Sequence, residues 1–347
     1  MKKKLIGLTI MVVLISFLSF YKLDAYIMSP GSAYDVSRFV TVQNGDELDE
    51  GTFNLMTVSL MRATPLLYGL SKVREYQQIM PLNQVRQEEE DDEEYAVRQL
   101  KLMNDSQFNA LYVAFSRANL NYSITYKGVF VLNVLKGGAA DGILKAGDEI
   151  VEVNGERIDK QATLVDKINE LQQNEDITIT INRNNELLDK TISLKEIPGG
   201  DGRIGLGITF SESKSIKTDP RVKINTEDIG GPSAGLMFTL EILNQLLDED
   251  LTKGYKVAGT GEMNEDGTVG RIGGIDYKVV AADQDGMEIF FAPDDTITDK
   301  MLESNPNLVS NYESAVKTAE KIGTKMKIVP VKTIDDALNY LQALEPK

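Results

Sequence analysis

One serine and one lysine have types and a spacing that could do chemistry. Ser233 lies in the glycine-rich run 230–235, and Lys278 follows forty-five residues later. The chain contains no histidine, which excludes a Ser-His-Asp hydrolase and histidine-bound zinc. A serine hydroxyl needs a neighbouring base, and a lysine serves as one if an apolar site lowers its pKa from about 10.4 towards about 7 or 8. We therefore predict that Ser233 and Lys278 form a nucleophile and base pair.

Composition narrows the classes of protein that this chain can be. Its 347 residues, 42% hydrophobic and 26% charged, suffice for two or three domains with packed cores. The net charge of -16 argues against nucleic acid as a partner, because its phosphates would be repelled. With neither cysteine nor histidine, we expect no disulfide, no metal and no cofactor. We interpret the acidic run 88–94 as a solvated loop or frayed helix end.

The amino-terminal segment predicts a membrane anchor over residues 1–24. Three lysines precede an uncharged run over residues 5–21, which is just long enough to cross a bilayer as a helix. A cleaved signal peptide has similar flanks, but no clear small-x-small cleavage site follows, so we favour an uncleaved anchor. The lysines should stay in the cytoplasm, which places a single-pass protein in the cell membrane with its C-terminal body outside.

Residues 25–119 combine strand-like and helical patterns. Alternating apolar residues predict strands between 26 and 62, and apolar residues at helical spacing predict a helix over about 93–118. The residues that set this helical spacing are Leu100, Met103, Phe108, Tyr112 and Phe115. We interpret the region as a structural collar between the membrane and the rest of the chain.

Residues 120–198 contain three short motifs in a fixed order. They are Gly137-Gly138-Ala139-Ala140, then Leu-Lys-Ala-Gly-Asp at 144–148, and then the Val-Asn-Gly turn at 153–155. Their order and spacing give these residues a resemblance to a PDZ domain of the bacterial protease type. It implies that an extended peptide adds to a sheet edge, with a helix over 163–172 beside the groove. Packing against a neighbouring domain is the alternative role. The strand residues that we assign to peptide binding are Gly128, Val129, Phe130 and Val131.

A hinge-like Pro-Gly-Gly-Asp-Gly sequence at 198–202 predicts a boundary, and residues 199–347 follow as a third unit. Strands are expected at 256–259, 287–291 and 327–331, alternating with helices. Thr333 and Asp336 form a capping-box pattern before the last helix. The expected fold class is therefore multidomain, α/β and α+β, behind one transmembrane helix.

Three blocks stand out in the third unit: Gly-Pro-Ser-Ala-Gly at 231–235, Thr-Gly-Glu at 260–262 and the run at 270–282. In this order they resemble the proteolytic domain of Lon proteases, over about residues 203–345. Together with the PDZ pattern and the anchor, the chain resembles the membrane-anchored PDZ and Lon-like (S16) serine proteases of Gram-positive bacteria. One departure is Gly230, where many Lon enzymes carry an aspartate.

The resemblance implies roles for the matching residues. Ser233 would be the nucleophile, Lys278 the general base, and Thr260 a hydroxyl that orients the lysine. Backbone N–H groups at the start of the helix would hold an oxyanion. The residues that we expect to shape this turn are Gly231, Pro232 and Ala234.

The phosphate-binding signature of an ATPase, Gly-x-x-x-x-Gly-Lys-Ser/Thr, is absent from the sequence. We therefore expect an ATP-independent serine endopeptidase that cleaves unfolded or small membrane-associated proteins, presented in part by the PDZ domain. A catalytically silent PDZ scaffold for a membrane complex is the alternative, and an acyltransferase or amidase is a third. Lon-like domains in the resembling families assemble as rings, so a homo-oligomer stays open.

Overall fold

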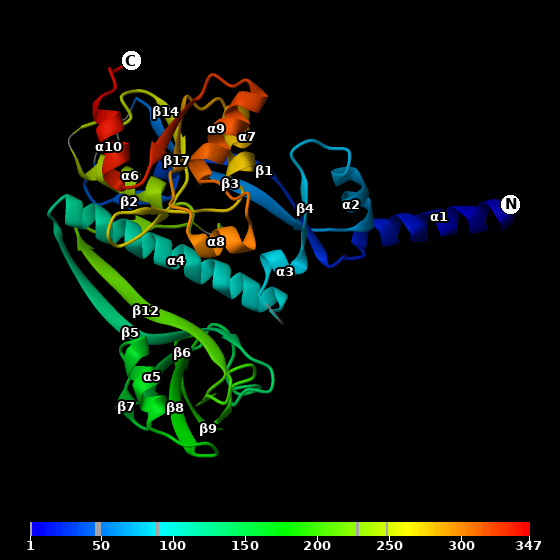
Figure 1. Cartoon of the computed structure of the whole chain (residues 1–347), viewed down its shortest axis with the longest axis vertical. Helices are drawn as coiled ribbons and strands as arrows, with labels where there is room; N and C mark the ends of the chain where they lie inside the picture. The colour runs from blue at the N-terminus through cyan, green and yellow to red at the C-terminus, as the bar shows by residue number, and fades with distance from the viewer. Residues whose placement is uncertain (1, 46–49, 88–89, 227–228, 248) are drawn as a thin grey trace. The chain divides into compact units, whose positions relative to one another are not determined.

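Two compact units make up the structure. The computed structural model describes residues 2–45, 50–87, 90–226, 229–247 and 249–347 (Figure 1). The first unit comprises Met1–Gln87, Lys223–Asn225 and Ser233–Lys347, and the second comprises Glu88–Val222 and Thr226–Pro232. Each unit has its own sheet and its own buried core.

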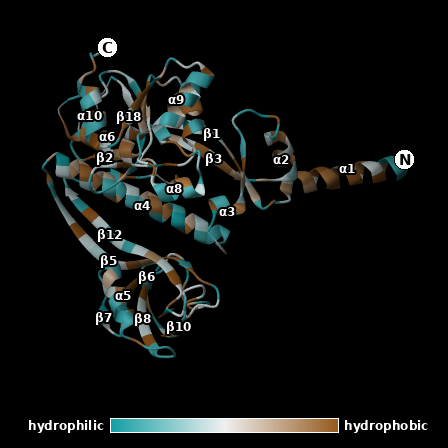
Figure 2. Ribbon diagram, viewed as in Figure 1, coloured by the Kyte–Doolittle hydropathy of each residue, from teal (hydrophilic) through white to brown (hydrophobic). Residues whose placement is uncertain are grey.

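The first unit begins with the expected amino-terminal helix, α1 (Lys2–Phe20). None of its residues is buried, its mean hydropathy reaches 1.9, and Figure 2 shows apolar residues along most of its length. Within the described ranges it is the one helix with the length and composition of a membrane span. A signal sequence near an amino terminus has the same properties.

A six-stranded sheet forms the centre of the first unit, in the order β18-β17-β14-β3-β1-β4. β3, β14, β17 and β18 are parallel, whereas β1 is antiparallel to its two neighbours. The three strands expected near the carboxyl terminus are therefore present. The bounds are β1 (Ala25–Asp35), β3 (Thr52–Arg62), β4 (Gln78–Pro81), β14 (Lys256–Gly259), β17 (Ile289–Pro293) and β18 (Lys327–Val331).

Helices cover both faces of this sheet. α7 (Ile275–Gln284) and α9 (Asn311–Ile322) pack together, while α6 (Gly235–Leu246) packs with α10 (Ile334–Gln342). The capping box predicted at Thr333 and Asp336 starts α10. The remaining elements of the unit are η1 (Val36–Arg38), β2 (Val40–Val42), α2 (Pro65–Ser71), α3 (Leu82–Val85), β15 (Glu262–Met263), β16 (Val269–Gly270) and α8 (Asp299–Ser304), and β13 (Val222–Ile224) lies at the boundary of the two units.

The strands expected as a collar are part of the central sheet. Thr52 to Leu55 of β3 pair in parallel with Lys256 to Gly259 of β14, so segments two hundred residues apart share one ladder. The interpretation of residues 25–62 as a separate collar is therefore replaced, because their strands complete the sheet that α6 and α7 cover. The boundaries of the expected domains otherwise stay a prediction.

The second unit contains a sheet in the order β12-β5-β6-β8-β9, with β7 paired to β6. Its core is aliphatic, with Val129, Val131, Ile150, Ile179 and Ile181 fully buried. The helix expected over 163–172 is α5 (Gln161–Asn169). The strands are β5 (Asn121–Val134), β6 (Glu149–Val153), β7 (Glu156–Arg157), β8 (Asp176–Arg183), β9 (Glu186–Ser193), β10 (Lys195–Glu196), β11 (Ile204–Gly205) and β12 (Ile208–Asp219).

The boundary expected at residues 198–199 does not separate the second sheet from β12. This strand pairs with β5 along its whole length, and Leu206 is buried in the same core. The hinge-like residues 198–202 form a turn between β10 and β11, which pair with each other. Glycine and proline therefore mark a tight turn inside the unit.

α4 (Asp92–Arg117) is the long helix expected over 93–118. Asp91 caps its first turn, and Glu94 completes a capping box. Acidic residues at a helix start complement the helix dipole, and buried Glu90 binds Arg98. The described part of the acidic run therefore starts the helix, and residues 88 and 89 lie outside the described residues.

Candidate active site

Ser233 lies in the turn directly before α6, which begins at Gly235 after the N-cap Ala234. The Thr260 hydroxyl and the Gly261 N–H both donate to the Ser233 carbonyl, at 3.0 and 2.9 Å. The Leu236 N–H donates in return to the Gly261 carbonyl at 3.1 Å. These bonds hold the serine backbone against the segment that follows β14.

Lys278 projects from the first turn of α7, a helix that begins against β1 and β3. Its N-cap, Gly274, has a φ of 69°, which is left-handed backbone that favours glycine. A Cβ there would lie 3.0 Å from Cγ1 of Val58 and 3.1 Å from Sδ of Met28. Glycine therefore lets α7 begin close to the sheet, and Lys278 is only 2% exposed.

The structure brings Ser233, Lys278 and Thr260 together. The Nζ atom of Lys278 lies 2.8 Å from Oγ of Ser233 and 2.8 Å from Oγ1 of Thr260. Thr260 is completely buried, whereas Ser233 is half-buried. The Ser233 hydroxyl is thus open to solvent on one side, while the Lys278 amine beside it is enclosed.

Burial lowers the pKa of Lys278 from 10.5 to about 7, because the charged ammonium loses its hydration in this setting. The four residues that follow it, 279–282, are all buried and apolar, as the sequence led us to expect. Because the Thr260 proton is directed to the Ser233 carbonyl, its oxygen accepts from the lysine amine. A neutral amine then has its lone pair free to accept the serine proton.

The turn before the serine has a conformation that only glycine adopts readily. Gly231 has a φ of 89°, and its N–H donates to the Gln99 carbonyl at 3.1 Å. Pro232 has no N–H, and its carbonyl accepts from the Ser106 hydroxyl at 3.0 Å. Gly231 therefore shapes the turn without offering an oxyanion donor, which leaves the N–H groups of Ser233 and Ala234 as candidates.

The four residues assigned to peptide binding form the expected strand, but the strand is interior to its sheet. Val129 pairs with Glu212 on β12 and with Ile150 on β6, and Phe130 likewise pairs on both sides. The backbone groups of Gly128 and Val131 also lie along the β12 ladder. Because both edges are taken, no peptide can add at residues 128–131, and the groove must lie elsewhere.

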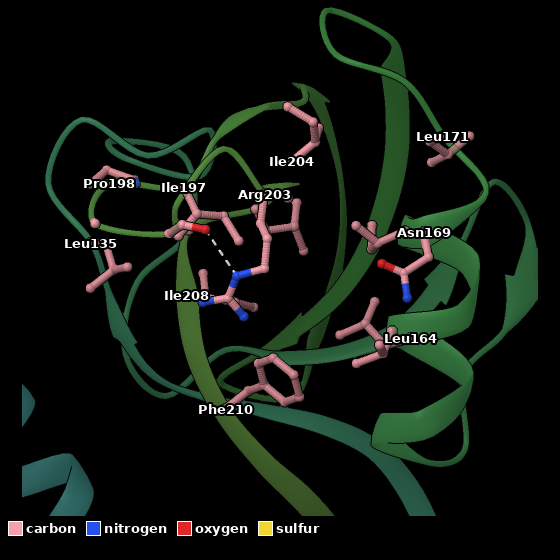
Figure 3. Close-up of a pocket in the computed structure, with 17 residues that line it drawn as sticks. Leu135, Leu164, Asn169, Leu171, Ile197, Pro198, Arg203, Ile204, Ile208 and Phe210 are labelled. Atoms are coloured by element: carbon pink, nitrogen blue, oxygen red, sulfur yellow. Dashed lines mark hydrogen bonds between the residues drawn. The ribbon is translucent and has the colours of Figure 1, made fainter.

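A pocket of about 620 Å³ opens in the second unit between α5 and the segment 203–208 (Figure 3). Its helix side carries Leu164, Val165 and Ile168 together with the polar Asn169, and Arg203 also lines the pocket. The opposite side is formed by backbone and apolar side chains from Ile204 to Phe210. The dimensions and the apolar side chains suit an extended peptide segment.

Sequence reasoning missed the Gly205-Leu206-Gly207 segment that lines this pocket. Gly207 has a φ of 71°, and a Cβ there would lie 2.9 Å from Cα of Gly138. The Ala140 N–H also donates to the Leu206 carbonyl. Two glycines alternating with apolar residues were the available signal, since glycine within a strand pattern marks close backbone approach.

Two family models match the chain. A model of the PDZ domain matches residues 99–194, and a model of the Lon protease (S16) C-terminal proteolytic domain matches residues 227–343. The chain carries a PDZ domain and a Lon-type proteolytic domain. The expected fold class and the expected combination of PDZ and Lon-like domains are confirmed. Ser233, Thr260 and Lys278 all fall inside the Lon-type match.

The chain is also similar to Lon proteases of several bacteria. The Lon protease of Metamycoplasma arthritidis is 29% identical over 152 residues, which are 44% of this chain and 16% of that protein. The Lon protease of Endomicrobium trichonymphae is 25% identical over 177 residues, 48% of this chain and 20% of that protein. The chain therefore spans a fifth or less of the length of these relatives.

Solved structures similar to this chain include PDZ domains. That of an SdrC-like protein from Listeria monocytogenes is 28% identical, with 25% of this chain and 92% of that chain covered and a TM-score of 0.24. A solution structure from Geobacillus thermodenitrificans is 33% identical, covers 24% of this chain and 97% of its own, and has a TM-score of 0.22. Scores of this size add nothing to the domain assignment, which rests on the family model.

Proposed function

We propose that the protein is a membrane-anchored, ATP-independent serine endopeptidase with a Ser233–Lys278 dyad. The observation that carries the proposal is the 2.8 Å contact between Ser233 Oγ and a buried lysine amine whose pKa is about 7. At neutral pH about half of such an amine is unprotonated, as a general base must be. The Lon-type domain around the pair supports peptide hydrolysis as the reaction.

The first half of the reaction transfers an acyl group to the serine. Ser233 Oγ attacks the carbonyl carbon of the scissile peptide bond while Lys278 Nζ takes the hydroxyl proton. The negative oxygen of the tetrahedral intermediate faces the N–H groups of Ser233 and Ala234 at the start of α6. The Lys278 ammonium then gives its proton to the leaving nitrogen, the C–N bond breaks, and an ester remains on Ser233.

Water completes the second half. Lys278 accepts a proton as the water oxygen attacks the ester carbonyl, and returns it to Ser233 Oγ as the C–O bond breaks. The product carboxylic acid leaves and loses its proton to solvent, and the neutral amine is restored. Thr260 acts in both halves as a positioning residue, because its oxygen holds one N–H of the amine and thereby turns the lone pair towards the serine.

The pocket between α5 and residues 203–208 is the proposed site of substrate presentation. Its lining favours an extended peptide with apolar side chains, as unfolded proteins and the ends of small membrane proteins have. A chain without a nucleotide-binding signature has no evident means of pulling folded substrates apart. α1 is the proposed anchor, uncleaved and with its lysines in the cytoplasm.

Cleavage of an unfolded protein tests the reaction. The purified full chain is incubated with reduced, unfolded casein, and the fragments are identified by mass spectrometry. Peptides that are absent with Ser233→Ala and with Lys278→Met support the endopeptidase. Fragments that persist in the Ser233→Ala variant overturn the dyad, and no fragments from the unsubstituted chain favour the silent scaffold.

Presentation by the pocket is tested separately. Val165 is an exposed residue of α5 at the pocket, and Leu187 is an exposed residue of β9 outside it. Val165→Glu should raise the KM for protein substrates and leave the cleavage of a short peptide unchanged, whereas Leu187→Glu should change neither. Equal behaviour of the two variants on every substrate would count against presentation by this pocket.

A further inference from the structure

A short segment next to α1 buries a polar residue and exposes apolar ones. We define the α2 segment as residues 65–77, the helix α2 and the turn after it. Leu66 is 46% exposed and Val73 is 80% exposed, whereas Ser71 is 5% exposed. Leu66 and Ser71 belong to the helix and Val73 to the turn after it, and a segment that faces water ordinarily buries its large apolar side chains and exposes its polar ones. The outward face of the α2 segment therefore suits an apolar environment.

The α2 segment is fixed beside the end of α1. α1 and α2 are in contact, and Figure 1 shows α2 next to the carboxyl-terminal end of α1. Leu67 and Leu23 both pack against the buried cluster that contains Ala63, and the Leu23 N–H donates to the Ala63 carbonyl at 2.8 Å. The apolar face therefore begins within a few residues of the point where the apolar run of α1 ends.

The residue types around this face are those of a membrane interface. Tyr21 follows α1 and is exposed, and Lys72 lies 4.9 Å from the ring centre of Tyr68. Arg74 adds a second cation to the α2 segment. Tyrosine rings and basic side chains gather at the level of lipid headgroups, where phosphates attract them. With two cations and the single acid Glu75, the α2 segment has a net positive charge, whereas the whole chain has a net charge of -16.

We infer that the α2 segment is a second membrane contact. Leu66 and Val73 enter the boundary between headgroups and acyl chains of the leaflet that receives the end of α1, while Lys72 and Arg74 lie against lipid phosphates. The inference rests on the proposed anchoring by α1. Two attachment points hold the first unit against the bilayer, so peptide segments close to the membrane surface become its preferred substrates.

The absence of cysteine from the chain makes a site-specific test direct. Single cysteines are introduced as Leu66→Cys, Val73→Cys, Val12→Cys in α1 and Leu302→Cys in α8, in full-length Ser233→Ala protein. Each is labelled with an environment-sensitive fluorophore and reconstituted into phosphatidylcholine and phosphatidylglycerol vesicles. Leu302 is the matched control, an exposed leucine of the same unit. Circular dichroism verifies that every labelled variant is folded.

The expected result is a blue-shifted emission and quenching by lipid-borne quenchers for the labels at 12, 66 and 73, but not at 302. A lipid-quenched label at 12 with a water-exposed label at 73 would overturn the second contact and leave the anchor standing. A label at 12 beyond the reach of lipid quenchers would overturn the anchor and this inference with it. A label at 73 shielded from aqueous quenchers but not quenched from lipid would mean that protein covers the face, which also refutes the inference.

Discussion

The pKa of Lys278 makes the pH dependence of cleavage the sharpest test of the dyad. An ordinary lysine of pKa 10.5 is neutral at pH 7 in only about three molecules in ten thousand, whereas a pKa of about 7 makes about half of them neutral. Burial therefore increases the fraction of Lys278 that is neutral at pH 7 by about 10³-fold. We expect kcat/KM to rise about tenfold from pH 5 to pH 6, to bend near pH 7 and to level off above about pH 8.

The assay is the initial rate of cleavage of a fluorogenic peptide that has no titratable group between pH 5 and 10. Glu262 is the matched control, since it lies two residues after Thr260 and burial raises the pKa of its carboxyl. Glu262→Gln should leave the midpoint of the profile unchanged. A midpoint near pH 4 to 5 that disappears in this variant would assign the base to the carboxylate and refute the role of Lys278.

Three further outcomes follow from contacts of named residues. Because the pKa of Lys278 is lowered in the folded protein, its ammonium destabilises the fold most below about pH 7. Lys278→Met in a Ser233→Ala background should therefore raise the free energy of unfolding there by up to about 5 kcal/mol. In urea titrations this gain should shrink as the pH rises from 7 to 10.5. Thr260→Val should lower kcat by about 10- to 100-fold with little change in KM, and unchanged kcat in steady-state assays would contradict its positioning role. Asp148 is fully buried and accepts two hydrogen bonds from Arg183, of 2.6 and 2.7 Å. Asp148→Asn should therefore lower the free energy of unfolding by about 3 kcal/mol. A loss below about 1 kcal/mol in urea titrations would show that the ion pair is dispensable.

The candidate site could be predicted because its signals are local. A serine at a glycine-rich helix start and a lysine followed by four apolar residues need no knowledge of distant partners. Helix starts were equally readable, as at Thr333, because a cap acts within one turn. The link between Ser233, Thr260 and Lys278 came from the resemblance of three separate blocks to Lon proteases, because no local signal connects residues this far apart.

Strand partners could not be predicted in the same way. The alternation at 52–62 indicates a strand but carries no information about its neighbour, and its parallel partner β14 begins about two hundred residues later. The strand at 128–131 was likewise expected correctly, yet β12 covers the edge that we assigned to a peptide. Pairing is decided by tertiary packing, which periodicity alone does not report.

The groove could not be predicted from the sequence because the glycine that marks it is required by a contact with a residue far away in the chain. Gly207 is required by the approach of Gly138, and these two residues are far apart in the sequence. The adjacent turn at 198–202 has the glycine and proline content of a domain boundary, although the segment that lines the pocket follows it within the same unit. Similarly, the bond from the Gly231 N–H to Gln99 becomes visible only once α4 is in place.

The ladder between β5 and β12 runs from Val134 and Ile208 at one end to Asn121 and Asp219 at the other. The chain therefore enters the PDZ core through β5 and leaves it through β12, which lie side by side. The 73 residues 135–207 therefore connect the two strands of one antiparallel ladder. Because the two ends of this segment lie side by side, evolution can replace, lengthen or remove it without moving the strands that flank it.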